Sequence, residues 1–265
     1  MKLELLISCM HQKDASIITR SNVDSDVVVI NQCDIDKKEN FNFFNRNGVS
    51  CKTIIISTTE RGLSRSRNMA ISNATGDICL ICDDDETLVD GYNDIIINAF
   101  QKHPEASVIT FALDYKNKKF PLKEKKVGYF RAMKTNSIQI AFRRDQILKK
   151  SIQFDVTMGS GTGNGGGEEV RFLFDCLKKG LKIRYIPEII ASVANNGSQW
   201  FQGFTDKYFL DRGWSNRRLL GLPLACCYAL YFSMKNYSIY RFDNTFWNAL
   251  RYQLKGSFEK RPINN

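Results

Sequence analysis

The sequence predicts an α/β fold in which a mostly parallel central sheet is flanked by helices, with a helical appendage at the C-terminal end. Three observations support this prediction. Short apolar runs of strand length recur along most of the chain, and amphipathic helical patterns separate them. The runs are continuously apolar, which is typical of parallel strands covered on both faces. After residue 209 the composition changes to aromatic, basic and aliphatic residues.

The individual elements follow from apolar runs, periodicity and helix stops. Strands are expected at residues 3–9, 26–31, 52–57, 77–82, 106–113, 137–142 and 181–186. Helices are expected at 63–75, 90–102, 144–150 and 168–179, with helix or loop at 11–20 and an exposed loop at 116–126. Gly76 and Gly180 end two of these helices, and Pro104 follows a third. Strands that alternate with helices indicate βαβ units with right-handed crossovers.

Length and composition indicate one large domain with a short addition. The 265 residues are 43% hydrophobic, which is enough for a full core. We expect a domain at residues 1–205 and a helical, basic and aromatic segment at 206–265. The eight cysteines show no disulfide spacing, and the start leads into a strand without a secretory pattern. Both features predict a cytoplasmic protein.

The net charge of +10 is concentrated in two clusters. One lies within residues 116–126, and the other is spread over residues 212–261. Because the second cluster interleaves with aromatic and aliphatic residues, it favours an anionic membrane surface over nucleic acid. Binding of a phosphate-rich polymer is the alternative. The apolar stretch at 219–234 has 16 residues, fewer than the ~20 that a membrane-spanning helix needs. We therefore expect peripheral attachment at the inner membrane face.

An acidic run, Cys82-Asp83-Asp84-Asp85-Glu86, directly follows the fourth predicted strand. Consecutive carboxylates repel one another unless a cation compensates. Mg²⁺ and Mn²⁺ take oxygen ligands, usually one or two carboxylates completed by nucleotide phosphates. Ligands of open α/β sheets also bind at the carboxyl ends of strands. The run therefore predicts a metal-held nucleotide, and an acidic turn or helix cap is the alternative.

A glycine-rich stretch precedes the predicted helix at 168–179. Gly161-x-Gly163-x-x-Gly166 satisfies the dinucleotide-binding pattern literally, but Glu168 and Glu169 would repel a pyrophosphate from that helix N-terminus. We favour a backbone that folds tightly around a substrate, with one glutamate as a general base. The alternative is that these glutamates only stabilise the first turn of the helix.

Taken together, these stretches resemble the family 2 glycosyltransferases of the GT-A fold, particularly bacterial enzymes of capsule and exopolysaccharide synthesis. The resemblance covers roughly residues 3–200. It rests on four motifs in the same order as in the family, at residues 62–68, 75–77, 83–85 and 165–169. The resemblance implies a nucleotide-sugar donor and a Mn²⁺ or Mg²⁺ cofactor.

The resemblance also assigns roles to individual donor-site residues. Asp83 and Asp84 would face the nucleotide, and Asp85 would hold the metal that bridges the diphosphate. Arg67 would line the nucleotide pocket. The strand ends that hold the base would contribute Ser8, Met10 and Asn31. Asn31 stands where the family usually has aspartate, but its amide can both accept and donate, so uracil is still a compatible base.

On the acceptor side, the resemblance makes Glu169 the base that deprotonates the acceptor hydroxyl. Glu168 would orient the acceptor, or the two glutamates exchange roles. Gly166, Gly167 and Trp200 would contact the acceptor. Many relatives have a metal-binding histidine after the following strand, but residues 191–200 contain none.

The predicted activity is an inverting, metal-assisted sugar transfer from a nucleotide sugar, UDP-linked by preference, to a hydroxyl of a lipid-linked or polysaccharide acceptor. A homo-oligomer is compatible with this prediction. Two alternatives are a nucleotidyltransferase acting on sugar phosphates and a non-catalytic binding or scaffold protein of the same fold. The missing histidine and Asn31 favour the scaffold, and Asp83, Asp85 and Glu169 oppose it.

Overall fold

The computed structural model describes residues 1–115, 119–193, 201 and 203–261. Its strands are β1 (Leu3–Met10), β2 (Asp26–Gln32), β3 (Lys37–Phe44), β4 (Ser50–Thr58), β5 (Ile78–Asp83), β6 (Glu86–Leu88), β7 (Val108–Asp114), β8 (Lys125–Lys126), β9 (Ile140–Arg143) and β10 (Ile183–Val193). Its helices are α1 (Ser16–Arg20), α2 (Leu63–Asn73), α3 (Tyr92–Lys102), α4 (Tyr129–Ala132), α5 (Arg144–Lys149), α6 (Glu168–Lys178), α7 (Asp206–Leu220), α8 (Leu222–Lys235), α9 (Tyr237–Tyr240) and α10 (Phe246–Phe258), with a 3-10 helix, η1, at Ser137–Gln139.

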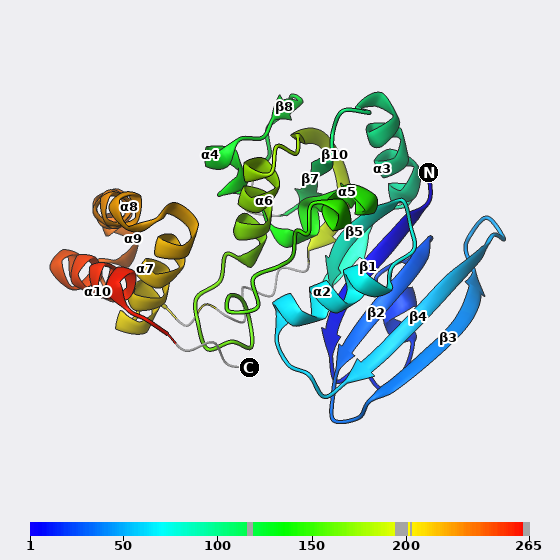
Figure 1. The fold of residues 1–265 in the computed structure, drawn as a ribbon, viewed down its shortest axis with the longest axis horizontal. Helices are drawn as coiled ribbons and strands as arrows, with labels where there is room; N and C mark the ends of the chain where they lie inside the picture. Colours follow the sequence, from blue (N-terminus) through cyan, green and yellow to red (C-terminus); the bar gives the residue numbers. More distant parts are fainter. Residues whose placement is uncertain (116–118, 194–200, 202, 262–265) are drawn as a thin grey trace.

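One sheet organises the molecule, in the order β3-β4-β2-β1-β5-β9-β7-β10-β6, with β8 paired to β10. The strands β4, β2, β1, β5, β7 and β10 run in one direction, whereas β3, β9, β6 and β8 run against their neighbours. The predicted α/β fold with a mostly parallel sheet is therefore confirmed. The carboxyl ends of β1, β2 and β5 lie side by side at one edge of the sheet (Figure 1).

Helices cover both faces of this sheet, as the continuously apolar strands require. Alternate residues of β1 enter different cores: Leu5 and Ile7 pack with α1 and α3, and Leu6 packs with α2 and α6. The interior of β1 is therefore apolar on both sides, which is why its sequence shows no alternation.

Several predicted elements differ from the structure, and β6 and α4 were not predicted. β3 was not predicted, because this edge strand pairs antiparallel with β4 and carries mostly exposed polar side chains. The strand predicted at 137–142 begins as η1, whose capping box between Asn136 and Gln139 delays the strand to Ile140. β10 extends to Val193, beyond the predicted 181–186. The short β8 lies within the loop predicted at 116–126.

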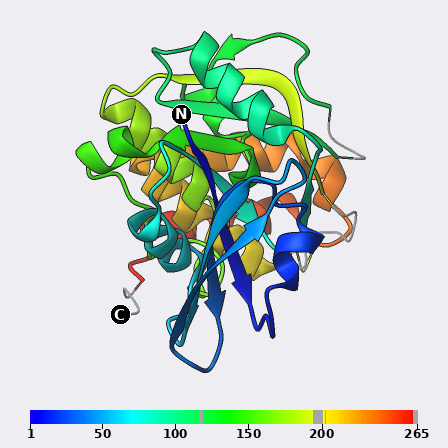
Figure 2. The same cartoon turned by 90° about the vertical axis from the view of Figure 1, so that its right-hand side faces the viewer.

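The C-terminal helices α7 to α10 form a small core of their own, made by Phe209, Phe232, Tyr240 and Ala249. The apolar stretch at 219–234 is interrupted at Gly221, where α7 ends and α8 begins. In the described part of the chain, no helix is long and apolar enough to cross a membrane. Figure 2, viewed from the β3 end, shows these helices in orange and red on the far side of the sheet.

Glycines allow α7 and α10 to approach closely. A Cβ added to Gly213 would lie 1.9 Å from the Gln253 carbonyl oxygen, and one added to Gly256 would lie 2.0 Å from that of Leu210. The two backbones are therefore in direct contact, and Ser257 Oγ donates to the Gly213 carbonyl at 3.2 Å.

Candidate functional site

The acidic run forms a turn at the carboxyl end of β5. Asp83 is the last residue of β5, Asp84 and Asp85 are exposed in the turn, and Glu86 begins β6 and is buried. The Asp83 amide donates to Glu86 Oε1 at 3.2 Å, while Glu86 Oε2 is buried without a hydrogen-bond partner. Four neighbouring carboxyl groups are thus arranged at the strand edge where ligands of α/β proteins bind.

Burial and the charge of neighbouring carboxylates raise the pKa of Asp84, Asp85 and Glu86. Desolvation, followed by the charge of Asp83, raises the pKa of Asp85 and raises that of Glu86 well above its ordinary value. Desolvation also raises the pKa of Asp84. A cation near Asp85 would relieve this repulsion, so the donor set fits a hard divalent metal.

Protein ligands alone do not complete such a site. Among the residues that the structure describes, no three His, Cys, Asp or Glu side chains are grouped to hold a metal. Mg²⁺ and Mn²⁺ commonly keep only one or two carboxylate ligands and take the rest from phosphates and water. The geometry therefore suits a metal that binds together with a diphosphate.

Arg67 connects the acidic turn to the glutamate pair. Its guanidinium is fully buried on α2 and donates to Asp83 Oδ1 at 2.9 Å and Oδ2 at 3.2 Å. Its other terminal nitrogen donates to Glu168 Oε1 at 3.0 Å. The Phe154 ring lies 5.4 Å from the guanidinium carbon and closes one side. Two motifs far apart in the sequence therefore meet on one side chain.

The two glutamates have different surroundings at the start of α6. Glu168 is buried against Arg67, and a Cβ on Gly159 would lie 2.9 Å from its carboxyl carbon. Glu169 is partly exposed to solvent. Desolvation, with the neighbouring charge of Glu168, raises the pKa of Glu169 to about 8. The two glutamates therefore differ: Glu168 is paired with a cation, and the pKa of Glu169 is raised to about 8.

This titration predicts a pH dependence. As the base that the family resemblance assigns, Glu169 would act in its deprotonated form, so kcat/KM should rise by about tenfold per pH unit below a pH of about 8 and level off above it. Steady-state rates across this range check the prediction, and a flat profile would contradict it. Folding stability should change in the opposite direction. The Glu169 carboxyl group keeps its proton up to about pH 8 in the folded protein but only up to about pH 4.5 in the unfolded chain, so the free energy of unfolding decreases as the pH rises between these values.

The glycine-rich loop that carries this pair is held between two helices. Gly159, Gly161, Gly163 and Gly167 have left-handed φ values of 95°, 85°, 73° and 98°, where side chains are strained. On the α2 side, Leu63 N donates to the Ser160 carbonyl at 3.0 Å. On the α7 side, a Cβ on Gly165 would lie 2.2 Å from Ser215 Oγ. The predicted acceptor-contacting Gly166 is exposed and Gly167 is partly exposed.

The residues predicted at the other strand ends lie at the same sheet edge. Ser8 stands opposite Asp83 in the sheet, and Asn31 stands opposite Cys9. Ser8 Oγ is 2.8 Å from Ser66 Oγ on α2. The Asn31 amide accepts from Gln12 N and donates to the Gln12 carbonyl, both at 2.9 Å. In this structure both side chains therefore contact other parts of the chain.

Three further points complete the placement of the predicted residues. Met10 ends β1 and is exposed. Trp200 lies outside the described residues. Ser137 was not predicted, yet its hydroxyl donates to Asp83 Oδ2 at 3.2 Å. A lone serine at the start of a predicted strand gives no sequence signal for such a role.

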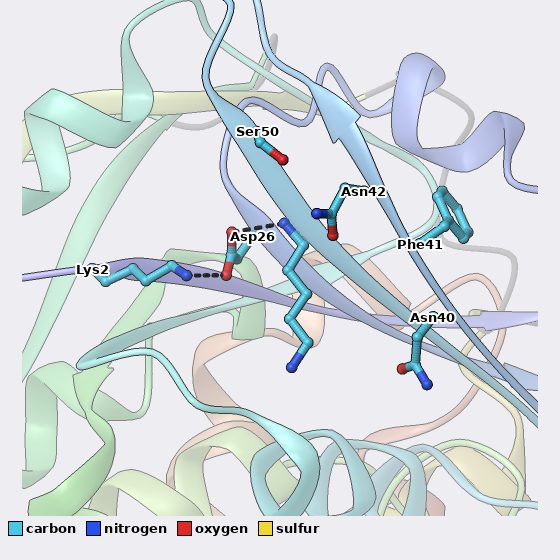
Figure 3. Close-up of a pocket in the computed structure, with 7 residues that line it drawn as sticks. Lys2, Asp26, Asn40, Phe41, Asn42 and Ser50 are labelled. Carbon is cyan, nitrogen blue, oxygen red and sulfur yellow. Dashed lines mark hydrogen bonds and ion pairs between the residues drawn. The ribbon is translucent and has the colours of Figure 1, made fainter.

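A cavity lies away from this edge of the sheet. A hollow of about 600 Å³ is lined by Lys2, Asp26, Lys52 and β3 residues, where β2 and β4 begin (Figure 3). Asp26 forms an ion pair there with Lys2 Nζ and accepts a hydrogen bond from the Lys52 amide. Because ligands of α/β sheets bind at the carboxyl ends of the strands, we do not assign the donor site to this hollow. A second cavity, of about 320 Å³, lies beside Gly163 and Lys207.

The arrangement defines an α/β protein with its candidate site at the carboxyl edge of the sheet, and solved structures of the same fold can be compared with it. S. aureus TarS 1–349 in complex with UDP-GlcNAc superposes with a TM-score of 0.60 at 15% identity, covering 92% of this chain and 74% of that chain. The mannosyltransferase PcManGT from Pyrobaculum calidifontis, in complex with GDP-Man and Mn²⁺, gives a TM-score of 0.51 at 14% identity, covering 97% and 85%. At these identities the likeness shows the GT-A fold alone.

Family membership rests on the sequence itself. The family model described as glycosyl transferase family 2 matches residues 15–163. The chain belongs to the family 2 glycosyltransferases. The matched region includes α2, with Arg67, and the acidic turn, and it ends just before Glu168. No curated protein matches the chain.

Proposed function

We propose that this protein transfers one sugar from a nucleotide sugar to a hydroxyl of a lipid-linked or polysaccharide acceptor, with inversion, in bacterial surface polysaccharide synthesis. The observation that carries the proposal is the buried Arg67, which joins Asp83 of the acidic turn to Glu168 of the acidic pair. In this proposal Asp83 acts on the donor side and Glu168 on the acceptor side, and their shared contact with Arg67 supports a single site. The solved neighbours bind UDP-GlcNAc and GDP-Man, and this supports a nucleotide-sugar donor. We propose a UDP-linked sugar.

The chemistry requires one group to take a proton and another to stabilise a leaving diphosphate. The acceptor oxygen attacks the anomeric carbon, its proton passes to the Glu169 carboxylate, and the bond from that carbon to the diphosphate oxygen breaks. A single in-line displacement of this kind inverts the anomeric centre. Glu168 is tied to Arg67, so the proton acceptor in our proposal is the neighbouring glutamate, whose pKa is about 8.

Asp85 is the residue we propose to hold the metal, with Asp83 and Asp84 facing the nucleotide. A bound Mn²⁺ or Mg²⁺ would neutralise charge that develops on the leaving diphosphate. The pKa of Asp85 is raised by desolvation and then by the charge of Asp83, and this supports the role because a bound cation would favour the charged carboxylate against both effects. The Mn²⁺ in the Pyrobaculum complex is consistent with such use of a metal.

Ligand-induced stabilisation tests the donor site directly. UDP or GDP with Mn²⁺ should stabilise the wild-type protein by about 2.7 kcal/mol at ~100 times the dissociation constant. The measurement is thermal unfolding with each diphosphate, with and without Mn²⁺. Asp85→Ala should abolish the metal-dependent part of the shift.

Asp94→Ala is the matched control, because Asp94 is an exposed aspartate in the first turn of α3, away from the acidic turn. Its ligand-induced shift should equal that of the wild type. The proposal fails if neither diphosphate stabilises the protein with metal. A metal-dependent shift that survives in Asp85→Ala would remove Asp85 from the metal site.

A further inference from the structure

The C-terminal helices expose an unusual set of large apolar side chains. Phe242 is 84% exposed, Trp247 74%, Met234 64% and Ile239 62%. They lie in one stretch of chain that runs from the end of α8 through α9 to the start of α10, and Tyr231 adds a fifth exposed side chain. We call these five residues the α8–α10 surface. Single exposed apolar residues are ordinary, but several large ones within one short stretch of chain indicate an interaction site.

The charge around this surface is mostly positive. Residues 219–258 contain four basic residues, Lys235, Arg241, Arg251 and Lys255, and one acidic residue, Asp243. All four cations are exposed. Two of them lie against its rings: Arg241 is 4.7 Å from the centre of Phe242, and Lys235 is 5.2 Å from that of Tyr231. Aromatic rings flanked by Lys and Arg are typical of segments that lie in a membrane interface.

A second copy of the chain is a poorer occupant. In a two-fold symmetric dimer the same patch meets itself, so the basic residues of one copy would face those of the other. The single carboxylate, Asp243, already accepts from the Phe204 amide at 3.5 Å. A partner with a negative, laterally extended surface fits the charges without such repulsion.

We propose that the α8–α10 surface docks the protein on an anionic lipid bilayer. The aromatic and aliphatic side chains would enter the headgroup region, and the four cations would contact lipid phosphates. In cells this would be the cytoplasmic leaflet, which carries the anionic lipids. Docking itself does not depend on the sugar-transfer proposal.

The same helices link this surface to the candidate site. Arg171 of α6 donates to the Arg218 carbonyl of α7 at 2.6 Å, and Gly165 packs on the α7 backbone at Asp211. Docking through α8 to α10 would therefore hold the glycine-rich loop at a set position relative to the bilayer. If the proposed function holds, an acceptor carried on a lipid would then reach the glycine-rich loop from the bilayer surface.

Co-sedimentation with liposomes tests the docking. The full chain is mixed at low salt with vesicles of phosphatidylcholine alone or of equal parts phosphatidylcholine and phosphatidylglycerol. The double variant F242S/W247S should partition to the anionic vesicles about tenfold or more weakly than the wild type. The variant K235Q/R251Q should also bind more weakly, and salt should release the wild type.

Phe44→Ser is the matched control, because Phe44 is 75% exposed on β3, at the other end of the molecule. It should bind as the wild type does, and thermal unfolding should show that all variants fold. Equal binding by F242S/W247S and the wild type would overturn the proposal, as would no binding to anionic vesicles. A dimer in light scattering that F242S/W247S dissociates would instead assign the surface to self-association. Because no sugar donor is present, these outcomes are independent of the transferase test.

Discussion

Glu169→Gln is expected to lower kcat by about 10²- to 10⁴-fold, the usual contribution of general-base catalysis, while the dissociation constant of the donor stays unchanged. Glutamine has nearly the same shape but cannot accept a full proton. The rise of rate with pH towards about 8 should disappear together with the activity, because the titrating group is lost. Steady-state kinetics and donor titrations on the same preparation measure both effects.

Two comparisons make this result specific. Glu188→Gln changes an exposed glutamate on β10 and should leave both constants unchanged. Glu168→Gln should also reduce activity, but it removes a partner of Arg67 and should therefore reduce thermal stability too. If Glu169→Gln weakened donor binding as much as turnover, Glu169 would be a binding residue. If Glu168→Gln alone lost the pH dependence, the two roles would be exchanged.

Arg67→Gln is expected to have the largest effect on stability, about 3–5 kcal/mol. The guanidinium is the buried cation between Asp83 and Glu168, so its removal leaves two carboxylates without compensation. Arg67→Lys should recover only part of the loss, because one ammonium group cannot reproduce the fork that contacts both carboxylates. Chemical unfolding measures the free energies.

Arg65→Gln is the matched control on the same helix. Arg65 is partly exposed and its ion pair with Glu60 lies near the surface, so the expected loss is below about 1 kcal/mol. Equal losses for Arg65 and Arg67 would show that the buried pairing is not what stabilises the site. A stable Arg67→Gln that had lost donor binding would assign Arg67 to the nucleotide alone.

The sequence was sufficient for the fold because the buried strands are unmistakable. β1, β2, β4 and β5 contribute side chains to the cores on both faces of the sheet, and short runs rich in valine and isoleucine are typical of such buried strands. β3 escaped prediction because its stability comes from pairing with β4 and not from burial of its own side chains. Backbone pairing of that kind leaves no periodic signal in a sequence.

The candidate site could be predicted in its parts but not in its connections. The acidic turn and the glutamate pair can be recognised in the sequence, because consecutive carboxylates repel one another and therefore indicate a compensating cation or a functional role. The sequence does not predict that Arg67 contacts both motifs, because Arg67 and Glu168 are 101 positions apart. The folding of α2, β5 and α6 against one another brings these side chains into contact. Likewise, Asn31 was placed correctly at a strand end, whereas its contacts with Gln12 depend on how the loop after β1 folds back.

The contacts of the glycine-rich loop imply a thermodynamic role for the C-terminal helices. Glycine loses more backbone freedom on ordering than any other residue, so a loop with four left-handed glycines is costly to fix. The α7 backbone at Gly165 and the Lys207 ammonium, which donates to the Gly163 carbonyl at 3.3 Å, help to offset that cost. The helices thus act as a template on which the segment carrying Glu168 and Glu169 becomes ordered, and the sheet alone would hold it only from the α2 side.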